Sequence, residues 1–284
     1  MRKLFPGYYT PTQDEIKRAW AEGIFSFDTN MLLNIYRYPD HSRKAFFRAL
    51  EKLEGRIMIT HQAALEYHRN RKVAIKQRAG RIGELRKVFT DLAQMAKNSK
   101  KEHESRQAFY DVDIADIFDP VIESLKKAKT KADQIKTSVK VEPTTETNYI
   151  QDELFKYIEE RIGKSIRDMD AVYGRASRRH SLKIPPGYKD SSSVDFADAS
   201  DGNFNDSSKN DFTRFGDTII WFQLLDFARS NDKPLIFVTD DNKPDWWERS
   251  ENRPRPELVN EMRSVSNISV CTCIGTVSTR QLSA

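Results

Sequence analysis

Acidic residues stand at the ends of two short apolar runs, where a carboxylate could bind a metal ion or a substrate. Asp28 follows the run at 24–27, while Asp240 and Asp241 follow the run at 235–239. Short, near-continuous apolar runs are typical of buried strands in a parallel sheet. Open α/β sheets bind their ligands at the carboxyl ends of such strands, so we expect these acids to lie along one edge of the sheet.

Two further acids are placed by helices that would leave the same edge. Glu66 follows the apolar run at 57–59, and Asp217 opens the helical pattern that precedes the run at 235–239. Four carboxylates converging with no lysine between them repel one another, and Mg²⁺ or Mn²⁺ relieves that repulsion because hard cations take oxygen ligands. Such an ion lowers the pKa of a bound water and stabilises a phosphoryl transition state. Each acid taken singly also fits a helix cap or a turn.

The elements that would position these acids read as an α/β fold. Thr12 and Glu15 have the spacing of a capping box, which predicts a helix through about residue 22. A strand, two helices and a second strand follow between residues 24 and 59, in the order of a βαβ unit. The remaining elements are expected as a helix from 217 to about 229, a strand at 235–239, a helix around 258–262 and a strand at 268–273.

A long helical stretch separates the second predicted strand from the third. Ile82, Leu85, Phe89 and Leu92 alternate three- and four-residue spacings, which makes a narrow apolar seam. Pro120 is expected to break the helical pattern.

The segments that follow this stretch read as a linker and a long loop. Residues 142–145 have the composition of a linker, and residues 181–212 that of a polar loop. We therefore expect a discontinuous core of residues 1–74 and 205–284, with residues 75–204 forming a basic helical insertion and the polar loop.

Basic residues gather on the helical stretch beyond Glu66. The net charge of the 284-residue chain is +5, a mild bias toward polyanionic partners. A basic wall beside an acidic cleft would contact phosphates without reading bases, although a run of charges is also typical of a solvated helix face. The residues expected to contact nucleic acid are Arg69, Arg71, Lys72, Arg178, Arg179 and Lys183.

The cysteine content and the hydropathy of the chain indicate the cellular compartment of the protein. Cys271 and Cys273 lie two apart on the predicted closing strand, too close along it for a disulfide and without further ligands for zinc. The N-terminus has no apolar signal core, and no stretch approaches a membrane span. We expect a cytoplasmic protein that does not enter a membrane.

Four tracts are similar to the acidic motifs of the PIN-domain nucleases, namely residues 27–30, 64–69, 215–217 and 237–241. Four more tracts resemble the bacterial PIN-like branch of these nucleases, namely residues 34–38, 185–190, 245–247 and 253–258. This resemblance implies a Rossmann-like α/β/α sandwich with a central parallel sheet, interrupted here by the helical insertion. It also implies Mg²⁺- or Mn²⁺-dependent nuclease activity, usually on RNA.

The resemblance assigns roles by position. Asp28 would be the first metal ligand, with Asn30 orienting it or its water, and Glu66 and Asp217 would be the second and third acids. The fourth acid is ambiguous, because the Thr-x-Asp pattern selects Asp241 while the strand end selects Asp240.

These features predict a metal-dependent endoribonuclease. A DNA nuclease acting in a bacterial defence or toxin system is a second hypothesis. A third is a non-catalytic module whose arm binds a protein or a nucleic acid, and each of the three is compatible with an oligomer.

Overall fold

The computed structural model describes residues 1–2, 4–53, 55–138, 145–189, 214–231, 233–248, 253–266 and 271–274. The chain forms two compact units: a core unit of Met1–Asn70 with Gln151–Ala284, and an arm unit of Arg71–Ile150. The predicted division differs in giving residues 71–74 to the core and residues 151–204 to the insertion, and it stays a prediction. The linker predicted at 142–145 and the polar loop predicted at 181–212 lie largely outside the described residues.

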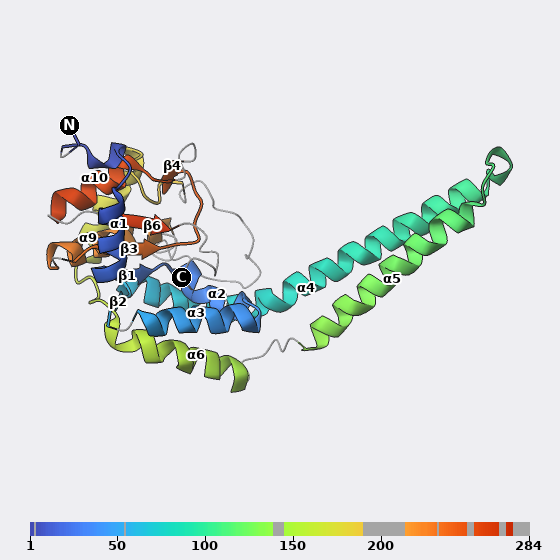
Figure 1. Ribbon diagram of the computed structural model, residues 1–284, viewed down its shortest axis with the longest axis horizontal. Helices are drawn as coiled ribbons and strands as arrows, with labels where there is room; N and C mark the ends of the chain where they lie inside the picture. Colours follow the sequence, from blue (N-terminus) through green and yellow to red (C-terminus); the bar gives the residue numbers. More distant parts are fainter. Residues whose placement is uncertain are drawn as a thin grey trace. The chain divides into compact units, whose positions relative to one another are not determined.

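A parallel sheet lies at the centre of the core unit (Figure 1). Its strands are β1 (Ile24–Phe27), β2 (Ile57–Met58), β3 (Leu235–Val238) and β6 (Cys271–Ile274). They are ordered β2-β1-β3-β6, and each neighbouring pair is parallel. β1 and β3 therefore end side by side, as the apolar runs predict.

Helices precede and follow these strands. The capping box is confirmed, because the Thr12 side chain accepts from Glu15 N–H at 3.2 Å and the Glu15 carboxylate accepts from Thr12 N–H at 2.7 Å. The helices of the core unit are α1 (Gln13–Glu22), α2 (Thr29–Arg37), α3 (Asp40–Lys52), α7 (Met169–Ser181), α9 (Gly216–Arg229) and α10 (Pro256–Val265). A short hairpin of β4 (Trp247–Glu248) and β5 (Arg253–Pro254) precedes α10.

Aromatic side chains cover one face of the sheet with α1 and α3. Phe25 and Phe27 point to the same face because side chains alternate along a strand. The ring centroid of Phe25 lies 5.5 Å from that of Trp20 in α1, and the ring centroid of Phe27 lies 5.9 Å from that of Phe46 in α3.

The opposite face is covered by α9. Phe237 is in register with Ser26, so it points away from Phe25 and Phe27. Its ring stacks on Trp246 at 5.3 Å, and Trp246 in turn meets Trp221 of α9 at 6.1 Å. Helices on both faces of a parallel sheet confirm the predicted α/β/α class. Trp221, Trp246 and Trp247 are buried, as expected for core residues.

The arm unit is a hairpin of two long helices. α4 (His61–Glu104) begins in the core unit, and α5 (Ile114–Ser138) follows after a 3₁₀ turn at Gln107–Phe109 (Figure 1). α6 (Thr145–Ile158) leads back to the core unit. Among the described residues, no helix has both the length and the apolar composition that a membrane crossing requires.

The predicted break at Pro120 is wrong, because α5 continues through this residue. Proline removes one backbone hydrogen bond, here to the carbonyl of Asp116. Pro120 lies on an exposed face of α5, where water can hydrate the carbonyl that loses its donor.

Candidate active site

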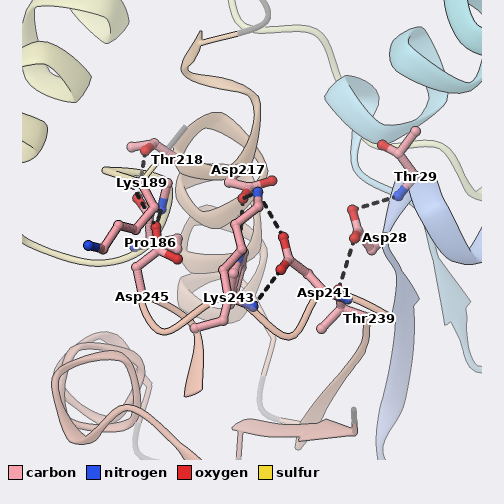
Figure 2. Close-up of polar contacts among 12 residues, drawn as sticks. Asp28, Thr29, Pro186, Lys189, Asp217, Thr218, Thr239, Asp241, Lys243 and Asp245 are labelled. Atoms are coloured by element: carbon pink, nitrogen blue, oxygen red, sulfur yellow. Dashed lines mark hydrogen bonds and ion pairs between the residues drawn. The ribbon is translucent and has the colours of Figure 1, made fainter. Parts of the chain in front are cut away.

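Asp28 occupies the point where β1 ends and α2 begins. Its carboxylate accepts from the backbone N–H of Thr29 at 2.7 Å and from the hydroxyl of Thr239 at 2.9 Å (Figure 2). Asp28 is 5 % exposed, so these two hydrogen bonds hold a carboxylate that has almost no contact with water. Thr29 and Thr239 thus fix its orientation. Asn30, which was expected to orient Asp28 or its water, is exposed, and its role stays a prediction.

Burial and neighbouring charge perturb this carboxyl group strongly. Burial, followed by the negative charges of Asp217, Glu66 and Asp241, raises the pKa of Asp28 from 3.8 to about 8, against the opposing hydrogen bond from Thr239. The four acids predicted from the sequence therefore lie within electrostatic reach of one another.

Glu66 lies in the first turns of α4 and is also held by hydrogen bonds. The amide of Gln62 donates to one oxygen at 2.8 Å and the hydroxyl of Thr29 donates to the other at 2.8 Å. Burial raises the pKa of Glu66, the two hydrogen bonds lower it, and the charge of Asp217 raises it further. Thr29 therefore contacts both Asp28 and Glu66.

Gly216 leaves the space that the Glu66 carboxylate occupies. A Cβ at this position would lie 2.4 Å from Glu66 Oε1, the end of a flexible side chain. We expect Gly216→Ala to cost less than about 1 kcal/mol of stability, because Glu66 can swing away, but to lower the activity proposed below at least about tenfold. Thermal unfolding and steady-state rates measure the two effects.

The matched control for Gly216→Ala is Gly174→Ala, in α7. A Cβ on Gly174 would meet no atom within 4 Å. This variant should keep full activity and gain slightly in stability, since alanine favours helix over glycine. Equal activities of the two variants would contradict the positioning of Glu66 by Gly216.

Lys243 lies between two of the acids, contrary to the expectation that no lysine separates them. Its ammonium contacts Asp217 at 3.2 Å and Asp241 at 2.9 Å (Figure 2). Trp246 also donates from its indole N–H to Asp217 at 3.1 Å. The sequence signal for Lys243 is its place two residues after Asp241, but the surrounding Asp-Asp-Asn-Lys-Pro stretch reads equally well as a turn.

Asp241 and Asp240 point to different surroundings. The Asp241 side chain is only 7 % exposed, and burial followed by the charge of Asp217 raises its pKa, while Lys243 lowers it. Asp240 is exposed and accepts a hydrogen bond from the Asn34 amide at 2.9 Å. The geometry therefore favours Asp241 as the acid that joins Asp28 and Asp217.

The chemistry of the four acids fits a hard divalent cation as their ligand. All four acids offer carboxylate oxygens, and the Lys243 ammonium already stands between two of them as a monovalent cation. Over the described ranges, no three His, Cys, Asp or Glu side chains lie close enough together to hold one ion as they stand. An ion bound to all four acids would therefore replace the Lys243 contacts.

The residues predicted to bind nucleic acid fall into two groups. Arg69 belongs to the core unit, where its charge lowers the pKa of Glu66, and Arg178 and Lys183 are exposed at the end of α7. Arg71 and Lys72 belong to the arm unit, and Arg71 donates to the carbonyl of Thr147 at 3.2 Å.

The expectation for Arg179 is wrong, because its guanidinium is used inside the protein. Arg179 is 9 % exposed, forms an ion pair with Glu261 and donates to the carbonyl of Pro185. Glu261 also accepts from the indole N–H of Trp221 at 2.8 Å. Arg179 thus joins α7, α9 and α10 through contacts within the protein.

Arg179→Met should destabilise the fold. Removing one partner leaves the partly buried Glu261 carboxylate without its counter-charge, which we expect to lower the free energy of unfolding by about 2–3 kcal/mol. The exposed neighbour Arg178 supplies the control, and Arg178→Met should change that free energy by less than about 0.5 kcal/mol. Urea unfolding of both variants makes the comparison, and equal losses would refute the assigned role.

The loop that follows α7 packs directly against Asp217, a contact that the sequence does not reveal. Asp245 is fully buried and accepts from the backbone N–H groups of Gly187 and Lys189, each at 3.0 Å (Figure 2). Thr218 donates to the carbonyl of Pro186 at 2.8 Å. Gly187 has φ of +91°, and a Cβ there would lie 3.2 Å from Asp217 Cβ.

A comparison with known families identifies the family of the chain. Residues 24–258 match the model of a family described as a PIN like domain. No curated protein and no solved structure matches the chain. The matched region runs from the first strand to α10 and contains all four acids. The chain belongs to the family of PIN-like domains.

Proposed function

We propose that this protein is a metal-dependent endoribonuclease that hydrolyses RNA phosphodiester bonds with water as the nucleophile. One observation carries the proposal. Asp28 is buried at the carboxyl end of β1, and the charges of Glu66, Asp217 and Asp241 act on it directly. Such an arrangement is unfavourable unless a cation compensates it.

Family membership supports the general class of activity. PIN domains are generally nucleases, and a nuclease fold implies a nucleic-acid substrate. The preference for RNA rests on the usual substrate of these nucleases.

Asp28, Glu66, Asp217 and Asp241 would hold the ion, which we propose to be Mg²⁺ or Mn²⁺. When bound, the ion supplies a water of lowered pKa and charge stabilisation at the phosphate. Thr29 and Thr239 keep the Asp28 carboxylate oriented, and Gln62 does the same for Glu66. Preorganised ligands of this kind need little rearrangement during the reaction.

Exposed cations on α4 and at the end of α7 would position the substrate. Arg69 follows Glu66 by three residues on α4, and Arg178 and Lys183 lie at the end of α7. Contacts from these side chains to phosphates would fix the strand without reading its sequence. The binding should therefore weaken as the salt concentration rises.

Cleavage assays on matched substrates test the proposal. A circular single-stranded RNA and the circular DNA of the same sequence should be incubated with the full chain in Mn²⁺, in Mg²⁺ or in EDTA. We expect the RNA circle to be linearised with either ion and to stay intact in EDTA, because a circle offers no end to an exonuclease. Cleavage of the DNA circle alone would show that the protein is a DNA nuclease instead. Binding of RNA without turnover in any condition would favour a non-catalytic module.

A further inference from the structure

A cavity of about 790 Å³ lies in the core unit, between β1, β2, α9 and residues 160–167. Its volume falls within the range of roughly 300–1,000 Å³ that is usual for small-molecule sites. The four acids of the candidate active site do not line it, and neither do the cations assigned above to substrate contacts. A smaller cavity of about 180 Å³ adjoins it and shares His61, Ser165, Ile166 and Gln223. The core unit therefore has room for a ligand outside the acidic cluster.

One side of α9 faces this cavity. Five lining residues recur at positions i, i+3, i+4, i+7 and i+8 of the helix and the turn that follows it, which places them on one side. They are Gln223, Asp226, Phe227, Ser230 and Asn231. The wall that α9 contributes therefore combines one aromatic ring with four polar side chains.

Apolar side chains of the sheet also line the cavity. Ile24 of β1 and Met58 of β2 both point to the face that α9 covers, because side chains alternate along a strand. Together with Phe227, which is partly exposed, they give the cavity an apolar part. Nucleobases are flat and stack on aromatic rings, so a base fits this part of the cavity by its chemistry.

Basic residues line the cavity from the segment that follows α6. Arg161, Lys164 and Arg167 form this basic cluster, and the last two are exposed. The lining contains two acids, Glu160 and Asp226, and Asp226 already has an ion pair with an arginine of its own helix. The balance of charge therefore favours an anionic ligand, and arginine and lysine are the side chains that bind phosphate best.

Hydrogen bonds connect the cavity to the second acid of the candidate active site. Gln223 donates from its amide to the carbonyl of Lys164 at 3.3 Å and accepts from the backbone N–H of Gln62 at 2.9 Å. The Gln62 side chain in turn donates to Glu66 at 2.8 Å. Gln223 therefore belongs to the wall of the cavity and to the surroundings of the acids.

We propose that this cavity binds a nucleotide, with the base on the apolar part beside Phe227 and the phosphate at the basic cluster. The choice of ligand rests on the proposed function, because Gln223 connects the cavity to a site that would act on RNA. A free mononucleotide and one nucleotide of an RNA strand offer the same chemistry, and a displacement experiment distinguishes these two sources.

Isothermal titration of the full chain with AMP, GMP, CMP and UMP in EDTA measures binding without cleavage. We expect at least one of the four to bind at one site per chain. The matching nucleoside and inorganic phosphate should each bind at least about tenfold more weakly, because each lacks part of the contacts. A single-stranded RNA that displaces the bound nucleotide identifies the strand as the source, whereas an RNA that binds together with it identifies a free nucleotide.

Variants of the lining locate the bound nucleotide. Phe227→Leu should lower the affinity at least about fivefold because it removes the stacking ring, and Phe227→Tyr should restore it. Arg167→Glu should lower the affinity at least about tenfold by repelling the phosphate. Lys17→Glu, an exposed site on α1 at the other face of the sheet, should leave the affinity unchanged. Circular dichroism checks that each variant stays folded.

Two results would overturn the proposal. One is the absence of saturable nucleotide binding, whether or not the protein cleaves RNA. The other is an equal affinity of Arg167→Glu and Lys17→Glu, which would place the nucleotide elsewhere. Nucleotide binding by a protein that fails to cleave RNA would support this site and contradict the proposed function alone.

Discussion

Asp28→Asn is expected to lower RNA cleavage by at least about a thousandfold while leaving the fold and RNA binding intact. The substitution removes the most buried of the four charges on which the proposed metal site depends. Asparagine has the same shape and can still accept from the Thr29 backbone N–H. Single-turnover cleavage and equilibrium binding of the same RNA measure the two properties separately.

The same variant should stabilise the metal-free protein near neutral pH. The pKa of Asp28 is about 8 in the fold, against 3.8 when unperturbed, so the folded state retains a proton that the unfolded chain loses between those values. Stability of the metal-free wild type should therefore fall as the pH rises from about 4 to about 8. Asp28→Asn removes this dependence, and we expect its melting temperature at pH 8 to be roughly 5 °C higher.

Asp240→Asn is the matched control for Asp28→Asn. Asp240 is an exposed acid at the end of β3 that bonds to Asn34. This variant should retain most of the cleavage activity and show no gain in stability. Full activity of Asp28→Asn, or an equal loss in Asp240→Asn, would contradict the assigned roles.

Lys243→Met is expected to tighten Mn²⁺ binding about tenfold in the absence of nucleic acid. The lysine ammonium contacts Asp217 and Asp241, so an ion bound to these acids must displace it. Methionine keeps the length of the side chain and removes its charge. Isothermal titration with MnCl₂ measures the affinity without reference to cleavage.

Loss of the lysine should also lower the stability of the metal-free protein. Asp217 and Asp241 then repel each other without a counter-charge, and the loss is moderated because the Lys243 side chain is 37 % exposed. Lys233→Met, at the exposed start of the segment leading into β3, serves as the control for both measurements. Unchanged or weaker Mn²⁺ binding by Lys243→Met would show that the lysine does not occupy the position of the ion.

Features that depend on neighbouring residues could be read from the sequence. The capping box at Thr12 joins residues three apart, and the apolar runs before Asp28 and Asp240 mark buried strands directly. The order of strands and helices then brings the acids together, since parallel strands end at the same edge. The break expected at Pro120 failed because an exposed helix face tolerates the lost hydrogen bond.

Features that depend on long-range contacts could not be read in the same way. The place of Lys243 beside Asp217 depends on how the segment after β3 folds back on α9. Asp245 bonds to a loop 58 residues earlier in the chain, and Arg179 pairs with Glu261 across 82 residues. Composition alone does not distinguish an exposed arginine from a buried one, so it predicts the same role for both.

A crystal of the full chain soaked in MnCl₂ tests the central claim most directly, through the anomalous scattering of manganese. We expect an anomalous peak within about 2.3 Å of carboxylate oxygens from Asp28, Asp217 and Asp241, with Glu66 reached directly or through water, and with the Lys243 ammonium displaced. An absent peak at saturating Mn²⁺, with Lys243 still bound between Asp217 and Asp241, would contradict the proposed metal site.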